Sequence, residues 1–335
     1  MDKNQIRLTS SEIGSLWGEY INGTMTDMMN RYMVTIVEDA SIKAILEDAI
    51  QTFAKQKQQI VSFLENEGFP IPAGFSEGAD LNQGAGRLFT DLFCLNYLHV
   101  MTLHGLLGHT TALGVSVRKD LRDFFDSCDS DAKRMYHQTI ELLLEKGSFQ
   151  RDPLFYPQSK VEFISSKDFT DGFFGKGRKL AATEVVSISF NLKKGIMAKT
   201  LAIAFGQVAQ TKLIREFFTD TEKTSDDQIK SFSKIMQSDN LPAPKSWETE
   251  VTTSTHSPFS DKLMMYHMGF LFQAAQAYHG TGLAGAMRVD LVAAYEGAIL
   301  KNLLVTKKWF NIMVKYNWLE QPPLAPNREE MAKNQ

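Results

Sequence analysis

The chain has 335 residues, with 36 Lys or Arg against 39 Asp or Glu and a formal net charge of −3. Nucleic-acid-binding domains carry a basic face, so this balance argues against nucleic acid as a partner. No apolar run approaches the roughly 20 residues that span a bilayer. The N-terminal segment MDKNQIRLTS lacks the apolar core of a signal peptide. We therefore expect a cytoplasmic protein without membrane insertion.

The sequence contains one long internal repeat. Residues 8–75 align with residues 180–247 at a constant shift of 172, and later positions align at a shift of 170. A repeat of this length predicts two duplicated domains rather than a solenoid of short units. The expected division is a first domain at 1–152, a linker at 153–179, a second domain at 180–325 and a tail at 326–335.

Each repeat has the pattern of four helices, because apolar residues recur every three or four positions. Thr90 and Asp91 give the third helix a capping hydroxyl and an acidic first turn, and Ser260 and Asp261 repeat this signal. The four apolar stripes of the first repeat cover residues 13–28, 42–64, 92–113 and 121–143.

The connections predict how these helices are arranged. Helices one and two join around Asp39, and helices three and four around residues 114–116, so each pair is antiparallel. A long segment rich in Gly and Pro, residues 67–88, separates the pairs and can run the length of the bundle. One long crossover between two helical hairpins is the ferritin-like arrangement. We therefore predict an all-α protein of two tandem ferritin-like four-helix bundles.

The segment between the repeats is predicted to be ordered. From Arg151 to Leu180 it contains a short strand-like run at residues 160–164 and several aromatic residues. Aromatic side chains carry a large apolar surface, so we expect those of the linker to pack on the bundles.

Two segments resemble a known family. HTTALGVSVRKDLRDFF at residues 109–125 and ELLLEKGSFQRDP at residues 141–153 resemble a domain of Bacillus-type bacteria, domain of unknown function 3231, which often occurs twice in one chain. The resemblance implies a ferritin-like fold similar to spore coat proteins of the F type, and with it a spore-associated setting. It implies no particular chemistry. The second repeat departs from the pattern at the close, where Tyr316 and Asn317 replace Lys146 and Gly147.

A ferritin-like fold raises the question of a di-iron centre. Such a centre needs Glu-x-x-His on two helices, because that spacing puts both ligands on one face. None of the seven histidines has a glutamate three residues before it. A di-iron centre is therefore not expected, and any cofactor is unknown. The chain also lacks nucleotide-binding and hydrolase motifs, which favours a protein that is not an enzyme.

The candidate site consists of ionisable and amide residues that recur in both halves. The topology predicts that Glu12, His109, Arg118 and Asp120 gather at one end of the first bundle, where such groups could hold a divalent metal or a small ligand. His109 and His279 are the best candidates for a metal ligand. The full set is Glu12, Gln56, His109, Arg118, Asp120, Glu184, Gln228, His279, Arg288 and Asp290.

A structural interpretation competes with the ligand site. Thr9 and Glu12 form a capping box, and an Arg118–Glu12 salt bridge would tie the fourth helix to the first. We therefore predict a structural or interaction protein, with protein partners or self-association. The alternative is a metal- or small-ligand-binding protein with one site at the end of each bundle.

Overall fold

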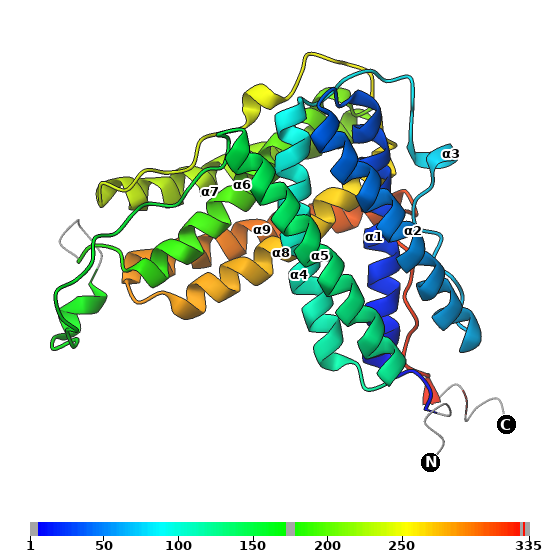
Figure 1. Cartoon of the computed structure of the whole chain (residues 1–335), viewed down its shortest axis with the longest axis horizontal. Coiled ribbons are helices and arrows are strands. Elements are labelled where there is room, and N and C mark those ends of the chain that lie inside the picture. The colour runs from blue at the N-terminus through cyan, green and yellow to red at the C-terminus, as the bar shows by residue number, and fades with distance from the viewer. Residues whose placement is uncertain (1–5, 172–177, 329–330, 332–335) are drawn as a thin grey trace.

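The computed structural model describes residues 6–171, 178–328 and 331. The regular elements of the described residues are helices, which form two four-helix bundles (Figure 1) and confirm the predicted all-α fold. The long helices are α1 (Ser10–Ile36), α2 (Ala40–Asn66), α4 (Asp91–Val115) and α5 (Lys119–Glu145) in the first bundle, and α6 (Ala182–Val208), α7 (Lys212–Ser238), α8 (Asp261–Gly285) and α9 (Val289–Lys315) in the second.

Local signals in the sequence fix where several helices begin. Thr9 and Glu12 form the predicted capping box at the start of α1. Thr90 caps α4 by accepting from the Phe93 amide, and Ser260 caps α8 in the same way. The hydroxyl satisfies a backbone donor that has no partner within the helix, so each start is defined by one side chain.

Each bundle contains one long crossover between two antiparallel hairpins. The first crossover lies between α2 and α4 and contains the short helix α3 (Glu77–Asp80). The second lies between α7 and α8 and contains a 3₁₀ turn, η4 (Glu248–Glu250). No helix among the described residues is long and apolar enough to cross a membrane.

The two repeats meet through equivalent residues. Leu81 pairs with Phe259, and Phe89 pairs with Val251, in isolated antiparallel bridges. Leu81 and Val251 are equivalent in the two repeats, as are Phe89 and Phe259. The Tyr97 hydroxyl lies 2.8 Å from Nε2 of His267, which occupies the equivalent position in α8. Reciprocal contacts of this kind are those of an isologous interface. One apolar cluster continues from the first bundle into the second, so the bundles share a core.

The linker differs from the prediction in two ways. Residues 160–164 form no strand, because no neighbouring strand pairs with them and an isolated strand leaves its backbone groups unpaired. Tyr156 and Phe163 are 94% and 90% exposed rather than packed on a bundle. The predicted packing of these aromatic residues is therefore wrong.

Only one described aromatic residue of the linker has a defined contact. Phe169, in the 3₁₀ turn η2 (Lys167–Thr170), lies under the Arg178 guanidinium, whose Cζ is 3.9 Å from the ring centroid. The aromatic residues Phe173 and Phe174 lie outside the described residues, as does most of the predicted tail.

After α9 the chain returns to the first bundle. The Glu320 carboxylate accepts hydrogen bonds from the Ala73 and Gly74 amides at 2.7 and 2.8 Å. This contact joins the end of the second repeat to the first crossover.

Candidate functional site

Glu12 connects the start of α1 to the corner between α4 and α5. Its Oε1 accepts hydrogen bonds from the Val117 and Arg118 amides, both at 2.8 Å, and its Oε2 accepts from the Thr9 amide and hydroxyl. Burial raises the pKa of the Glu12 carboxyl, but the hydrogen bonds outweigh it, so the pKa lies below its usual value. Glu12 is fully buried, and its oxygens are occupied by protein donors.

The predicted Arg118–Glu12 salt bridge is not the contact that forms. Because Glu12 accepts from the Arg118 backbone, the Arg118 guanidinium is free to pair with Asp120 at 2.6 Å and Glu67 at 2.5 Å. Glu67 lies at the end of α2, so this network joins three helices.

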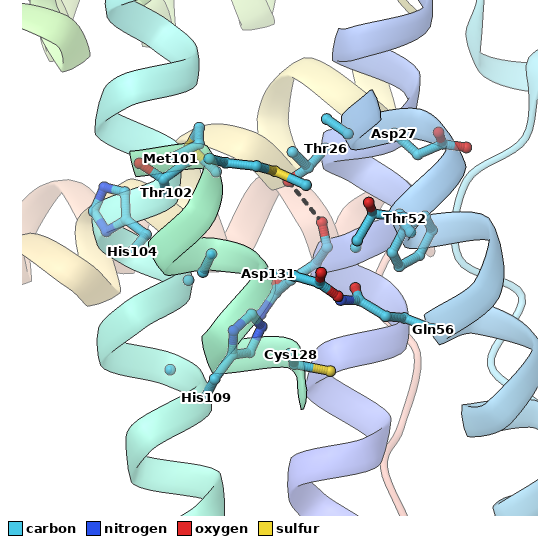
Figure 2. Close-up of a pocket in the computed structure, with 18 of the residues that line it drawn as sticks. Thr26, Asp27, Thr52, Gln56, Met101, Thr102, His104, His109, Cys128 and Asp131 are labelled. Atoms are coloured by element: carbon cyan, nitrogen blue, oxygen red, sulfur yellow. Dashed lines mark hydrogen bonds between the residues drawn. The ribbon is translucent and has the colours of Figure 1, made fainter. Parts of the chain in front are cut away.

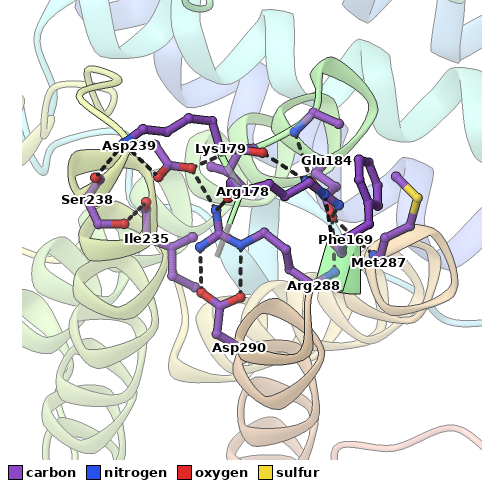
Figure 3. Close-up of polar contacts among 12 residues, drawn as sticks. Phe169, Arg178, Lys179, Glu184, Ile235, Ser238, Asp239, Met287, Arg288 and Asp290 are labelled. Atoms are coloured by element: carbon purple, nitrogen blue, oxygen red, sulfur yellow. Dashed lines mark hydrogen bonds and ion pairs between the residues drawn. The ribbon is translucent and has the colours of Figure 1, made fainter. Parts of the chain in front are cut away.

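The second bundle repeats this arrangement with one additional cation (Figure 3). Glu184 Oε1 accepts from the Met287 and Arg288 amides at 3.1 and 3.2 Å, and the Arg178 guanidinium donates to both carboxylate oxygens at 2.7 and 2.9 Å. Arg288 pairs with Asp290 and with Asp239, both at 2.7 Å.

Three residues of these networks, Glu67, Arg178 and Asp239, are not among the predicted site residues. Glu67 and Asp239 occupy equivalent positions at the shift of 172, but they differ in identity, and a comparison of identical residues alone overlooks them. Arg178 has no such signal, since it belongs to the segment before the second repeat. No group of three or more His, Cys, Asp or Glu able to hold a metal ion occurs in the described chain. At both bundle ends, donors of the protein itself occupy the oxygens of the recurring glutamate.

His109, predicted to gather with Glu12, instead lies six residues before the end of α4, and Gln56 lies on α2. Both line a cavity inside the first bundle (Figure 2). His109 Nε2 lies 3.3 Å from Glu19 Oε1, and Gln56 donates to Asp131 at 3.2 Å. Burial lowers the pKa of His109, but the Glu19 carboxylate outweighs it and the pKa lies above its usual value.

The equivalent residues in the second bundle have different surroundings. His279 is 4% exposed, stacks on Phe232, and has no hydrogen-bond partner among the described residues. Burial lowers its pKa to about 4. Gln228 donates to Asn302 Oδ1 at 2.8 Å. The predicted residues therefore divide into a bundle-end network and two interior positions in each bundle, and the pKa values of the two recurring histidines are shifted in opposite directions.

An exposed face of α9, which the sequence analysis did not identify, is the second candidate. Its residues alternate in spacing between four and three, the heptad pattern by which one helix packs along another. All of them are exposed, with Leu300 at 63% and Phe310 at 53%. We call this set the α9 seam: Val289, Ala293, Glu296, Leu300, Leu303, Lys307, Phe310 and Val314.

The equivalent face of α5 is mainly polar over the same length. Leu300 and Leu303 of the seam correspond to Ser130 and Lys133, at the shift of 170. The signal that could have identified the seam is a heptad of apolar residues in the fourth helix of the second repeat, which the fourth helix of the first repeat mainly lacks. The α5 positions are Lys119, Asp123, Asp126, Ser130, Lys133, His137, Ile140 and Leu144.

Comparison with known proteins identifies the family. No curated protein matches the chain. Among solved structures, the chain is similar to one titled "putative spore coat protein (BH2358)" from Bacillus halodurans C-125, with 20% identity and a TM-score of 0.41 over 47% of this chain and 100% of that one. The model of the family described as "Protein of unknown function (DUF3231)" matches residues 1–161 and 168–331. The chain therefore belongs to the DUF3231 family, which it contains in two tandem copies.

Proposed function

We propose that the chain is a non-enzymatic interaction protein that self-associates through the α9 seam. The observation that carries this proposal is an exposed heptad of mainly apolar residues on α9, where the equivalent α5 face is mainly polar. Exposed apolar patches of this extent mark interaction sites in soluble proteins. A second copy of the chain is the partner that the seam itself favours.

Two copies of α9 that pack antiparallel place the seam against itself, about a midpoint between Lys301 and Asn302. The spacings between seam residues read the same from either end of α9. In the antiparallel pair, each seam residue of one copy therefore faces one seam residue of the other. Ala293 then leaves room for the large side chain of Phe310, as packing of an interface requires. The facing pairs are Val289 with Val314, Ala293 with Phe310, Glu296 with Lys307, and Leu300 with Leu303.

The two charged residues of the seam support this register. Glu296 and Lys307 make no ion pair within the described part of the chain, although both lie on the seam. In the antiparallel pair, Glu296 of each copy faces Lys307 of the other. Opposite charges at core positions of paired helices select the register and the orientation.

Charge exchange tests the pairing. Wild-type protein at up to about 100 µM is expected to sediment as a dimer in analytical ultracentrifugation. Glu296→Lys places two lysines opposite each other and is expected to weaken the dimer by about tenfold or more. Glu296→Lys combined with Lys307→Glu restores the opposite charges and is expected to restore the dimer.

The matched control lies in the first bundle. Asp126 is the repeat equivalent of Glu296 and is also exposed on its helix, so Asp126→Lys changes charge equally without touching the seam and should leave the dimer intact. Wild-type protein that remains monomeric, or a double variant as weak as Glu296→Lys, contradicts the proposal.

A spore-associated setting belongs to the same proposal. It is supported by the resemblance of residues 109–125 and 141–153 to the domain related to F-type spore coat proteins. Immunoblots of growing cells and of purified spores of the source organism are expected to show the protein enriched in spores. Equal amounts in both would contradict this setting without affecting the test of self-association.

A further inference from the structure

The cavity of the first bundle has a volume of about 190 Å³ and lies between α1, α2, α4 and α5 (Figure 2). On α1 its lining runs from Glu19 to Asn30, a length of about 16 Å at the helical rise. Met101, Met135 and Phe53 supply apolar wall. A cavity of about 150 Å³ holds a benzene molecule, so this one has room for a ring or short chain with a polar head.

Carboxylates predominate among the charged residues of the lining. The lining contains three carboxyl groups, Glu19, Asp27 and Asp131, and two imidazoles, His104 and His109. Burial lowers the pKa of His104 well below its usual value. Asp131 is occupied on both oxygens, by Gln56 and by Arg134 from outside the lining.

Asp27 retains an unused oxygen. Arg31 donates to its Oδ2 at 2.8 Å, whereas Oδ1 is buried without a hydrogen-bond partner among the described residues. One turn further along α1, the side-chain oxygen of Asn30 is in the same state. Asp27 and Asn30 are 8% and 5% exposed. Buried polar atoms normally have partners, and both of these are acceptors, so a ligand that satisfies them must donate.

The second bundle lacks both the cavity and its carboxylates. The equivalent space is about 40 Å³. Glu19, Asp27 and Asp131 correspond to Asn191, Lys199 and Lys301. Larger residues stand at two further lining positions, Phe272 in place of Thr102 and Asn302 in place of Ala132. The acidic charge and the open space are therefore present together in one repeat and absent together from the other.

We infer that the first-bundle cavity binds a small organic ammonium ion with an apolar body. The ammonium group carries three donors and no acceptor, which matches the unused oxygens of Asp27 and Asn30. The apolar body would lie against the methionine and phenylalanine side chains. A carboxylate or phosphate ligand would bring further acceptors and negative charge to a lining that already has both.

Three ligands of similar ring size test this inference by isothermal titration calorimetry: benzylammonium, benzoate and toluene. Benzylammonium at millimolar concentrations is expected to bind the full-length protein at least about tenfold more tightly than either of the others. Asp27→Asn should remove most of this preference, because it removes the charge and keeps the shape. Asp123→Asn, on the exposed surface of α5, is the matched control and should bind as the wild type does.

A second variant locates the binding. Thr102→Phe combined with Ala132→Asn introduces the second-bundle residues at the same positions and should abolish binding. Circular dichroism and thermal unfolding identify any variant that has lost its fold, and Asp27→Asn then supplies the independent result. Benzoate or toluene bound as tightly as benzylammonium, no benzylammonium binding, or binding that survives in a folded double variant would each overturn the inference.

Discussion

The two bundles share the contacts at their helix ends and differ in their interiors and on their outer faces. Glu12 and Glu184 perform the same task, accepting two backbone amides at the corner of the last two helices. Between the ends, the first bundle has an acid-lined cavity and a mainly polar α5 face, whereas the second has a filled interior and an apolar α9 seam. Helix-end contacts are required by the fold, so both copies retain them. The interior and the outer face are where the copies differ.

The largest expected effect comes from the recurring glutamates. Glu184→Ala leaves the buried side of Arg178 unpaired together with three backbone amides, and should cost about 3–5 kcal/mol. Glu12→Ala removes hydrogen bonds but no paired cation, so its loss should be smaller. Urea denaturation measures both, with the exposed Glu141→Ala as control. Losses within about 0.5 kcal/mol for both glutamates would show that the ends are not structural.

The recurring glycines of the first helices should respond in opposite directions. A Cβ at Gly23 would lie 2.0 Å from Phe53 Cε2, so Gly23→Ala forces the ring to move and should cost about 1–3 kcal/mol. At Gly195 the nearest atom, on Ile229, is 3.4 Å away. Gly195→Ala should therefore be neutral or stabilise by up to about 1 kcal/mol, because alanine favours the helix. Equal losses in urea denaturation would show that the interiors do not differ as described.

The second-bundle histidine should weaken the protein in acid. Burial lowers the pKa of His279 to about 4, whereas an unfolded histidine titrates near 6.5. Below pH 6.5 the unfolded chain binds a proton that folded His279 does not, so stability falls from pH 6.5 toward pH 4. The free energy of unfolding of His279→Leu, measured relative to wild type, should be about 2 kcal/mol higher at pH 5 than at pH 7. The exposed His137→Leu is the control, and parallel stability profiles for wild type and His279→Leu would contradict the prediction.

The first-bundle histidine should act in the opposite sense. The Glu19 carboxyl has a lowered pKa because His109 outweighs its burial, and the pKa of His109 is raised. The pair therefore stabilises fully between about pH 4.5 and 6.5, and the contribution is lost above the raised pKa of His109 and below the lowered pKa of Glu19. Glu19→Gln with His109→Gln should cost about 1 kcal/mol more at pH 6 than at pH 9 in urea denaturation. A loss independent of pH would contradict the ion pair.

Much of the fold could be predicted from the sequence because it is encoded locally. Thr90 and Ser260 mark helix starts, the apolar spacing gives the helices, and the long crossover between short hairpins gives the topology. The repeat itself indicated that the two halves share one fold. The strand at residues 160–164 was wrong because strand formation depends on a neighbour, which no local pattern can supply.

The tertiary structure alone decided what each recurring residue does. His109 and His279 are equivalent in sequence, yet the Glu19 carboxylate raises the pKa of His109 whereas burial lowers the pKa of His279. The predicted gathering of His109 with Glu12 failed because His109 lies six residues before the end of α4, where its imidazole contacts Glu19 inside the bundle. Charge state, cavity volume and exposure depend on residues contributed by other helices, and their distances are set only when the bundle packs.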